Sequence, residues 1–178
     1  MSLAGKVVFV TGGCRSGKSR YAESLCTAVP GPRAYIATAE IFDEEMRERV
    51  RLHRAQRGDA FDTIEAPIDL AAALCGVPAG TTVVMVDCLT VWLGNLMHHL
   101  SDFDEDCPVI VDFLQALGEV SCQVVLVSNE LGMGIVPEHA MSRRFRDVAG
   151  RLNQRVAAIA DEAYLTVSGL PIKLKGSQ

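Results

Sequence analysis

Residues Gly12 to Ser19 read GGCRSGKS and match the pattern G-x-x-x-x-G-K-[ST] in full. The glycines let the backbone curl so that several N–H groups point at one phosphate group. The Lys18 side chain can reach the outer phosphates of a nucleoside triphosphate, and the Ser19 hydroxyl can bind Mg²⁺. An incidental glycine-rich turn is the alternative, but the run VVFV before the motif and a helical pattern after it favour a phosphate loop. The candidate nucleotide-binding residues are Gly12, Gly13, Cys14, Arg15, Ser16, Gly17, Lys18 and Ser19, with Lys18 also catalytic.

Asp87 ends the apolar run VVMVD at residues 83–87. A carboxylate at the end of a buried strand can bind, together with Ser19, the Mg²⁺ ion of a phosphate-loop enzyme. The alternative is that Asp87 caps the helix that follows. The presence of a phosphate loop in the same chain favours the metal role.

A single histidine, His53, stands among four arginines in the stretch RVRLHRAQRG at 49–58. Residues four apart share a helix face, so Arg49, His53 and Arg57 would form one stripe. Nearby cations lower the pKa of an imidazole, and a neutral imidazole is a competent nucleophile toward phosphorus. A solvated basic helix face explains the same pattern, and the spacing alone does not decide between these interpretations.

Short apolar runs that alternate with helical patterns must position these residues. Alternation of this kind predicts an α/β fold with a mostly parallel sheet flanked by helices, and the last two runs predict a C-terminal edge strand pair. The length of 178 residues favours a single domain spanning 1–178. The expected strands are 7–10, 33–38, 83–87 and 124–130, the expected helices are 19–29, 43–57, 70–76, 89–100, 109–120 and 139–161, and an acidic surface loop is expected at 101–108.

Composition excludes several classes of protein. Hydrophobic residues make up 49% of the chain and charged residues 22%, which is typical of a soluble globular protein. The net charge of −5 argues against general binding to nucleic acid or to an anionic membrane. No apolar run reaches the roughly 18 residues of a membrane span. Six cysteines without a CxxC pair predict reduced thiols in a cytoplasmic protein rather than a zinc site.

Five longer stretches carry a resemblance to a known family. They are VTGGCRSGKSRYAE, the matching positions of YIATAEIFDEEMRERVRLHRAQRGDAFDTIE, DCLTVWLGN, VLVSNELGMGIVPE and RRFRDVAGRLNQRVAAIADEAYLTVSGLPIKLK, in this order. Together they closely resemble the bifunctional adenosylcobinamide kinase / adenosylcobinamide-phosphate guanylyltransferase family of cobalamin biosynthesis. The resemblance covers nearly the whole chain and implies a RecA-like P-loop sheet and a homo-oligomer, a trimer in some members.

The resemblance implies two successive reactions. The enzyme first phosphorylates the hydroxyl of adenosylcobinamide, using ATP or GTP with Mg²⁺. It then transfers GMP from GTP to a histidine, and from the histidine to adenosylcobinamide phosphate, which gives adenosylcobinamide-GDP. The histidine followed by arginine in the matching segment is His53, the implied nucleophile. The resemblance also implies nucleotide contacts by Ala37, Thr38, Ala39, Arg54, Ala55, Gln56, Arg57, Glu65 and Asp87.

Two other functions are compatible with the same motifs. The first is a P-loop small-molecule kinase without covalent nucleotidyl transfer, in which His53 only binds phosphate. The second is a RecA-like nucleotide-binding module that acts as a switch or assembly protein. Covalent attachment of GMP separates the first alternative from the bifunctional enzyme, and turnover with a corrinoid acceptor excludes the second.

Overall fold

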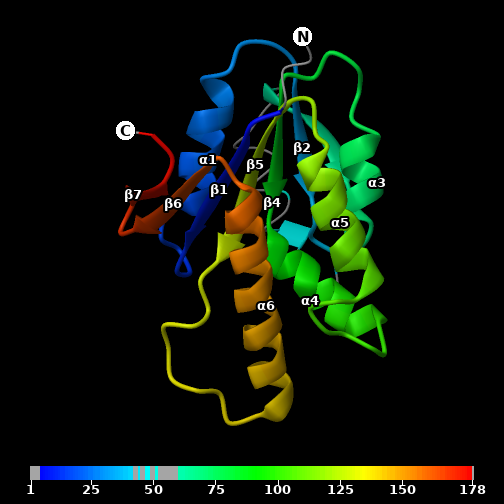
Figure 1. Cartoon of the computed structure of the whole chain (residues 1–178), viewed down its shortest axis with the longest axis vertical. Helices are drawn as coiled ribbons and strands as arrows, with labels where there is room; N and C mark the ends of the chain where they lie inside the picture. Colours follow the sequence, from blue (N-terminus) through cyan, green and yellow to red (C-terminus); the bar gives the residue numbers. More distant parts are fainter. Residues whose placement is uncertain (1–4, 42–43, 45–46, 49–50, 52–59, 178) are drawn as a thin grey trace.

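The structure is a computed structural model that describes residues 5–41, 44, 47–48, 51 and 60–177. In this part of the chain, seven strands form one sheet in the order β3-β2-β4-β5-β1-β6-β7 (Figure 1). The strands are β1 (Val7–Gly12), β2 (Arg33–Ala37), β3 (Asp62–Glu65), β4 (Val83–Asp87), β5 (Gln123–Asn129), β6 (Glu162–Val167) and β7 (Leu170–Lys175).

All neighbouring strands are parallel except the last pair, in which β7 runs antiparallel to β6. This arrangement confirms the predicted mostly parallel sheet and its C-terminal edge pair. The carboxyl ends of the parallel strands lie along one edge, where Gly12 is in register with Asn129 and Ala37 with Asp87. Ligands of open α/β sheets bind at this edge.

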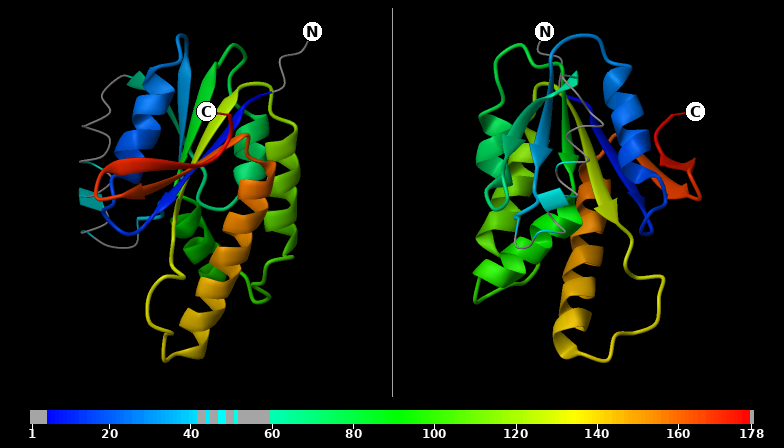
Figure 2. Two further views of the ribbon diagram at one scale, coloured as in Figure 1. Left: turned by 60° about the vertical axis from the view of Figure 1, so that its left-hand side comes forward. Right: turned by 180° about the vertical axis from the view of Figure 1, so that it is seen from behind.

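Helices cover both faces of the sheet (Figure 2). Helix α1 (Lys18–Thr27) packs on one face, where Val8 and Val10 of β1 point. The opposite face, where Val7 and Phe9 point, is covered by four helices. These helices are α3 (Leu70–Cys75), α4 (Leu89–His99), α5 (Pro108–Gly118) and α6 (Ala140–Ile159).

The apolar strands are buried because both faces are covered, as their continuous apolar sequence predicts. Trp92 of α4 is fully buried and lies edge-on to Phe113 of α5, with 5.0 Å between ring centres. Its indole N–H donates to the Ile68 carbonyl oxygen over 2.6 Å, so the one polar atom of the ring is satisfied. Among the described residues, no helix is long and apolar enough to cross a bilayer.

Two regions differ from the prediction. Strand β3 was not expected, because DTIE has one apolar residue and forms an edge strand with three of its four residues exposed. The stretch at 101–108 is not only a surface loop: Phe103 and Cys107 are buried, and Phe103 stacks on Phe145 of α6. The acidic neighbours of Phe103 dominate the sequence pattern and conceal this anchor.

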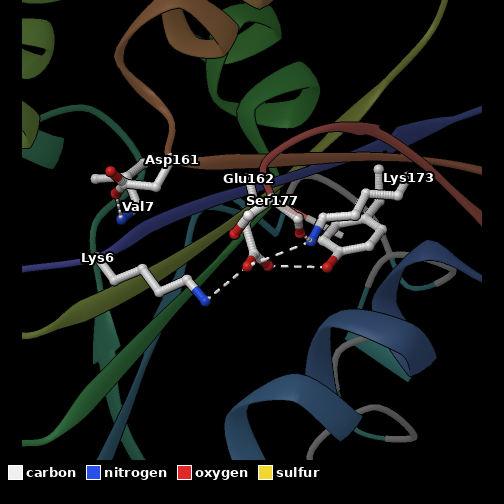
Figure 3. Close-up of polar contacts among 7 residues, drawn as sticks. Lys6, Val7, Asp161, Glu162, Lys173 and Ser177 are labelled. Carbon is white, nitrogen blue, oxygen red and sulfur yellow. Dashed lines mark hydrogen bonds and ion pairs between the residues drawn. The ribbon is translucent and has the colours of Figure 1, made fainter.

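The amino end of β6 is joined to its neighbours by charged side chains (Figure 3). The Glu162 carboxylate accepts hydrogen bonds from Lys6 Nζ over 2.9 Å and from the Tyr164 hydroxyl over 2.8 Å, and Lys173 Nζ lies 3.6 Å from it. The Asp161 carboxylate accepts from the Val7 N–H over 2.8 Å. These contacts connect the β6–β7 hairpin to the start of β1.

Candidate active site

The phosphate loop connects β1 to α1 at the carboxyl edge of the sheet. Its backbone has positive φ angles at Gly12 (153°), Arg15 (55°) and Gly17 (95°). Gly17 is the residue before the first turn of α1, so the N-terminus of this helix opens toward the loop. Gly13, Cys14 and Arg15 are exposed, whereas Ser16 is buried. The loop therefore presents a curled, accessible backbone on one side and is packed on the other.

Lys18 begins α1, and its side chain folds back over the loop. Its ammonium group donates to the Gly13 carbonyl oxygen over 2.6 Å, although the residue is only 8% exposed. Burial lowers the pKa of Lys18 below its ordinary value of 10.5, while Cys88, Asp87 and Cys14 act in the opposite direction. A buried cation with one carbonyl partner at the end of β1 is well placed to receive an anionic phosphate.

Cys88, which follows Asp87 at the end of β4, is joined to Thr38, which follows β2, by a pair of hydrogen bonds. The Thr38 hydroxyl donates to the Cys88 carbonyl oxygen and accepts from the Cys88 N–H, both over 2.9 Å. The helix that follows begins at Leu89 with Cys88 as its N-cap, so the alternative that Asp87 caps this helix is wrong. Burial raises the pKa of the Cys88 thiol to about 12, which leaves the thiol neutral beside Asp87.

The Asn95 side chain also holds the chain in place at the end of β2. It lies in α4, is almost fully buried, and donates through Nδ2 to the Thr38 carbonyl oxygen over 2.7 Å and to the Pro67 carbonyl oxygen over 2.9 Å. Glu40, two residues past Thr38, pairs with Nε2 of His99 at the end of α4 over 2.9 Å. The turn after β2 is therefore attached to α4 at two points.

The end of β5 lies between the loop and Asp87. The Glu130 N–H donates to the Gly12 carbonyl oxygen over 2.9 Å, and the Glu130 carboxylate accepts from the Gly132 N–H over 2.6 Å. The Thr90 hydroxyl accepts from the Asn129 N–H over 2.8 Å. Glu130 thus anchors both the phosphate loop and the loop that follows β5.

Residues that the sequence analysis proposed occupy different parts of this edge. The structure places Asp87 close enough to Lys18 to oppose the lowering of the Lys18 pKa, and it places Ala37 and Thr38 beside Asp87. Glu65 ends the edge strand β3, which three strands separate from β1. The remaining predicted site residues lie outside the described part of the chain: His53, Arg54, Ala55, Gln56 and Arg57.

The chemistry of the loop edge is compatible with a magnesium ion. A serine hydroxyl at Ser19 and a carboxylate at Asp87 are hard oxygen ligands, and Mg²⁺ bound with a nucleotide needs only one or two protein ligands. Within the described part of the chain, no group of three or more His, Cys, Asp or Glu residues could hold a metal ion alone. These residues therefore fit an ion that arrives with phosphates better than a dedicated metal centre.

Comparison with known proteins connects this geometry to a family. Residues 8–174 match the family model described as cobinamide kinase / cobinamide phosphate guanyltransferase. The chain belongs to this family. It is 41% identical over 182 residues to the bifunctional adenosylcobalamin biosynthesis protein CobU of Salmonella typhimurium, covering 95% of this chain and 99% of that protein. It is 42% identical over 172 residues to the bifunctional adenosylcobalamin biosynthesis protein CobP of Pseudomonas aeruginosa, covering 94% and 96%.

Solved structures of other families share the fold of this cobinamide kinase / guanyltransferase family member. The ATPase EscN of the enteropathogenic Escherichia coli type III secretion system aligns with a TM-score of 0.60 at 11% identity, over 93% of this chain and 43% of EscN. The KaiC-like protein PH0186 of Pyrococcus horikoshii aligns with a TM-score of 0.50 at 12% identity, over 91% and 71%. The fold is that of RecA-like P-loop ATPases, as expected.

Two residues that support the loops at this edge of the sheet, Asn95 and Thr166, were absent from the sequence predictions. Asn95 had a usable signal, because it interrupts the apolar stripe of LTVWLGNLM and a buried amide needs partners. Thr166 of β6 had none: its hydroxyl lies 2.9 Å from the Ser16 hydroxyl, but the two residues are 150 positions apart. Only the sheet order brings them together.

Proposed function

We propose that this chain catalyses two steps of cobalamin nucleotide-loop assembly. It phosphorylates adenosylcobinamide with ATP or GTP, and it then transfers GMP from GTP to the product to give adenosylcobinamide-GDP. One observation carries the proposal: a phosphate loop with a buried lysine, next to a strand-end carboxylate, occurs in a chain that matches the family over residues 8–174. We assign the activity to one domain of 1–178, since one sheet runs through the described residues.

The kinase step uses the loop edge. The N–H groups of the loop and of the first turn of α1 would bind the β- and γ-phosphates, and Lys18 would leave the Gly13 carbonyl oxygen to contact them. Ser19 and Asp87 would hold Mg²⁺, which when bound neutralises phosphate charge. The hydroxyl oxygen of adenosylcobinamide attacks the γ-phosphorus, its proton passes to solvent, and the nucleoside diphosphate leaves.

The guanylyl step uses His53. A neutral imidazole nitrogen attacks the α-phosphorus of GTP, an N–P bond forms, and pyrophosphate leaves. A phosphate oxygen of adenosylcobinamide phosphate then attacks the same phosphorus, the N–P bond breaks, and adenosylcobinamide-GDP is released. Arg54 and Arg57 would neutralise the phosphates during both displacements. We propose that Ala55 and Gln56 next to them, Ala37–Ala39 and Glu65 contact the nucleotide, by resemblance to the family.

We further propose that the protein works as a homo-oligomer, a trimer by family resemblance, in the cytoplasm. Contiguous exposed apolar side chains mark surfaces where copies of a chain meet. On the described surface they gather in the loop after β5 and on the edge strand β7: Met133, Ile135, Val136, Leu170, Ile172 and Leu174. All six cysteines carry free thiols, as expected in a reducing compartment. Sedimentation at several concentrations measures the oligomeric state, and a monomer at all of them would contradict the trimer.

The decisive experiment is covalent labelling. The protein, its His53→Ala variant and a control His139→Ala variant are incubated with Mg²⁺ and GTP labelled at the α-phosphate, then denatured. We expect acid-labile, alkali-stable label on wild type and on His139→Ala, since His139 is exposed at the start of α6, and none on His53→Ala. Absence of label from all three, with GTP binding intact, would leave a P-loop kinase. Absence of turnover with adenosylcobinamide as well would leave a binding module.

A further inference from the structure

The turn of the C-terminal hairpin touches the phosphate loop. The N–H of Gly169, in the turn between β6 and β7, donates to the Ser16 carbonyl oxygen over 2.9 Å. A Cβ atom built on Gly17 would lie 3.1 Å from the Cα atom of Gly169, so the two backbones are in close contact. The last strands of the chain thus form part of the support of a loop near its beginning.

A chain of neutral hydroxyl groups makes the second contact. The hydroxyls of Ser16 and Thr166 are 2.9 Å apart, and the Thr166 hydroxyl donates to the Thr11 carbonyl oxygen over 3.2 Å. Thr166 is 1% exposed, so these hydrogen bonds do not compete with water. A Cβ atom on Gly12 would lie 2.6 Å from the Thr166 hydroxyl and 2.4 Å from the Thr166 carbonyl oxygen. The glycine at the start of the loop is therefore required by Thr166 as well as by phosphate.

The loop needs such support because one of its residues, Arg15, is in an unfavourable backbone conformation. Three residues within the six from Gly12 to Gly17 have positive φ angles, and Arg15 among them is not a glycine. A residue other than glycine reaches this region only when its surroundings enforce it. Without nucleotide, the chain itself must supply these restraints.

The hairpin is suited to this role because its other end is fixed independently. Glu162, at the start of β6, binds Lys6 before β1 (Figure 3). Tyr164 packs edge-on against Tyr21 of α1 with 5.2 Å between ring centres. The turn is thus anchored to the elements on both sides of the loop, β1 and α1.

We propose that Thr166 and the turn Ser168–Gly169 are positioning residues for the phosphates of the nucleotide. They do not touch the nucleotide; they keep Ser16 in place, and through it the loop in its phosphate-binding conformation. A loop that populates this conformation less often binds with an affinity reduced by the same fraction. The inference rests on the proposed function only in that the loop binds a nucleoside triphosphate.

Two variants isolate the hydroxyl. Thr166→Ala and Thr166→Ser both remove the methyl group, and only the serine retains the hydrogen bonds to Ser16 and Thr11. Since one buried hydrogen bond corresponds to roughly a tenfold change in an equilibrium constant, we expect the KM for GTP in the kinase reaction and the Kd of GTP to rise about tenfold in Thr166→Ala. Both should stay within about twofold of wild type in Thr166→Ser. The kcat at saturating GTP should change little in either variant, because bound nucleotide restores the loop.

A hairpin control separates positioning from general stability. Lys173→Met removes a charged contact of the same hairpin far from its turn, and we expect wild-type GTP affinity. Equal KM and Kd in Thr166→Ala and wild type would overturn the inference, as would equal losses in Thr166→Ala and Thr166→Ser or the same loss in Lys173→Met. Failure of the proposed function gives a different result, because wild type itself would then lack covalent labelling or turnover with adenosylcobinamide, while the Kd of GTP could still be compared among the variants.

Discussion

The two ends of the parallel sheet are stabilised by different kinds of interaction. At the carboxyl end, buried neutral groups fix the loops: the side chains of Ser16, Thr38, Asn95 and Thr166 are all nearly inaccessible and hydrogen-bonded. At the amino end, charged side chains that water can reach form the contacts of Glu162 with Lys6 and Lys173. Buried neutral hydrogen bonds thus predominate at one end of the strands and ion pairs at the other, although Lys18, Glu40 and Glu130 also make charged contacts at the carboxyl end.

The difference follows from what the carboxyl end must bind. Fixed carboxylates around the loop would repel phosphates, and lysines paired there would compete with the ligand for charge, whereas hydroxyls and amides shape the backbone without either effect. A buried group left unsatisfied costs about 1–3 kcal/mol, while an exposed ion pair contributes about 0–1 kcal/mol. The carboxyl end is therefore expected to be the more sensitive to substitution.

Removal of the loop cation should have the largest effect on activity. We expect Lys18→Met to lower kcat/KM for phosphoryl transfer by at least about 100-fold, because we propose that Lys18 contacts the charge that develops in the transition state. The matched Lys6→Met variant removes an exposed lysine at the amino end and should keep its activity. Equal activity of Lys18→Met and wild type would contradict the role of the loop.

Substitution of Lys18, which should lower activity, should not lower the stability of the protein without nucleotide. Since burial lowers the pKa of Lys18 in the folded chain below 10.5, the unfolded chain binds its proton more readily, and unfolding is favoured at neutral pH. The Lys18 side chain should therefore make the free energy of unfolding of wild type rise with pH between the lowered pKa and 10.5. Lys18→Met should not show this rise. Without nucleotide, the variant is expected to melt no lower than wild type at pH 7, which calorimetry measures; a lower melting temperature would refute this.

A substitution of Asn95 tests the neutral hydrogen bonds at the carboxyl end of the sheet directly. Asn95→Leu leaves the Thr38 and Pro67 carbonyl oxygens without their amide donor in a buried site, and we expect the free energy of unfolding to fall by about 2–3 kcal/mol. Urea unfolding measures the loss. Gln115→Ala, on the exposed face of α5, should change stability by less than about 0.5 kcal/mol. Similar losses of unfolding free energy in Asn95→Leu and Gln115→Ala would contradict the special sensitivity of the carboxyl end.

Two exposed cysteines compare the loop with a distant surface. Cys14 lies in the phosphate loop and Cys75 at the end of α3, and both are exposed. Alkylation mapped by mass spectrometry should modify both in the free protein. With GTP at about 100 times its Kd, Cys14 should react at least tenfold more slowly and Cys75 at its original rate. Unchanged Cys14 labelling would mean that nucleotide does not cover the loop.

The smallest effect is expected at the amino end. The hydrogen bond from Lys6 holds the pKa of Glu162 below its usual 4.5, so the stabilisation is present above pH 4.5 and is lost as the pH falls through the lowered pKa. Glu162→Gln should cost at most about 1 kcal/mol at pH 7 and should lose this acid-range dependence, because its side-chain contacts are partly exposed. Added salt should shrink the difference from wild type. A larger loss of unfolding free energy in Glu162→Gln than in Asn95→Leu would mean that the amino end is the more sensitive of the two.

The sequence predicted what depends on local pattern. The apolar runs that became β1, β2, β4 and β5 are buried on both faces, and the glycines of the GGCRSGKS motif permit the positive φ angles seen at Gly12 and Gly17. Strand β3 was missed because an exposed edge strand lacks that pattern. Thr166 could not be found, because its role depends on a contact across 150 residues. The assignment of His53 remains a prediction, since it rests on the sequence of a segment outside the described residues.

The sheet order also fixes when, during synthesis, the phosphate loop becomes complete. Strand β1 lies between β5 and β6, and the loop is supported by the turn at Gly169. The ribosome makes residues 12–19 early and Thr166 some 150 residues later, which at 5–20 residues per second takes roughly 8–30 s. For most of that time the nascent chain contains the whole motif but lacks both strands next to β1, and β6 is the later of the two to be made. Nucleotide is therefore expected to bind more weakly to the growing chain than to one that has reached the β6–β7 turn.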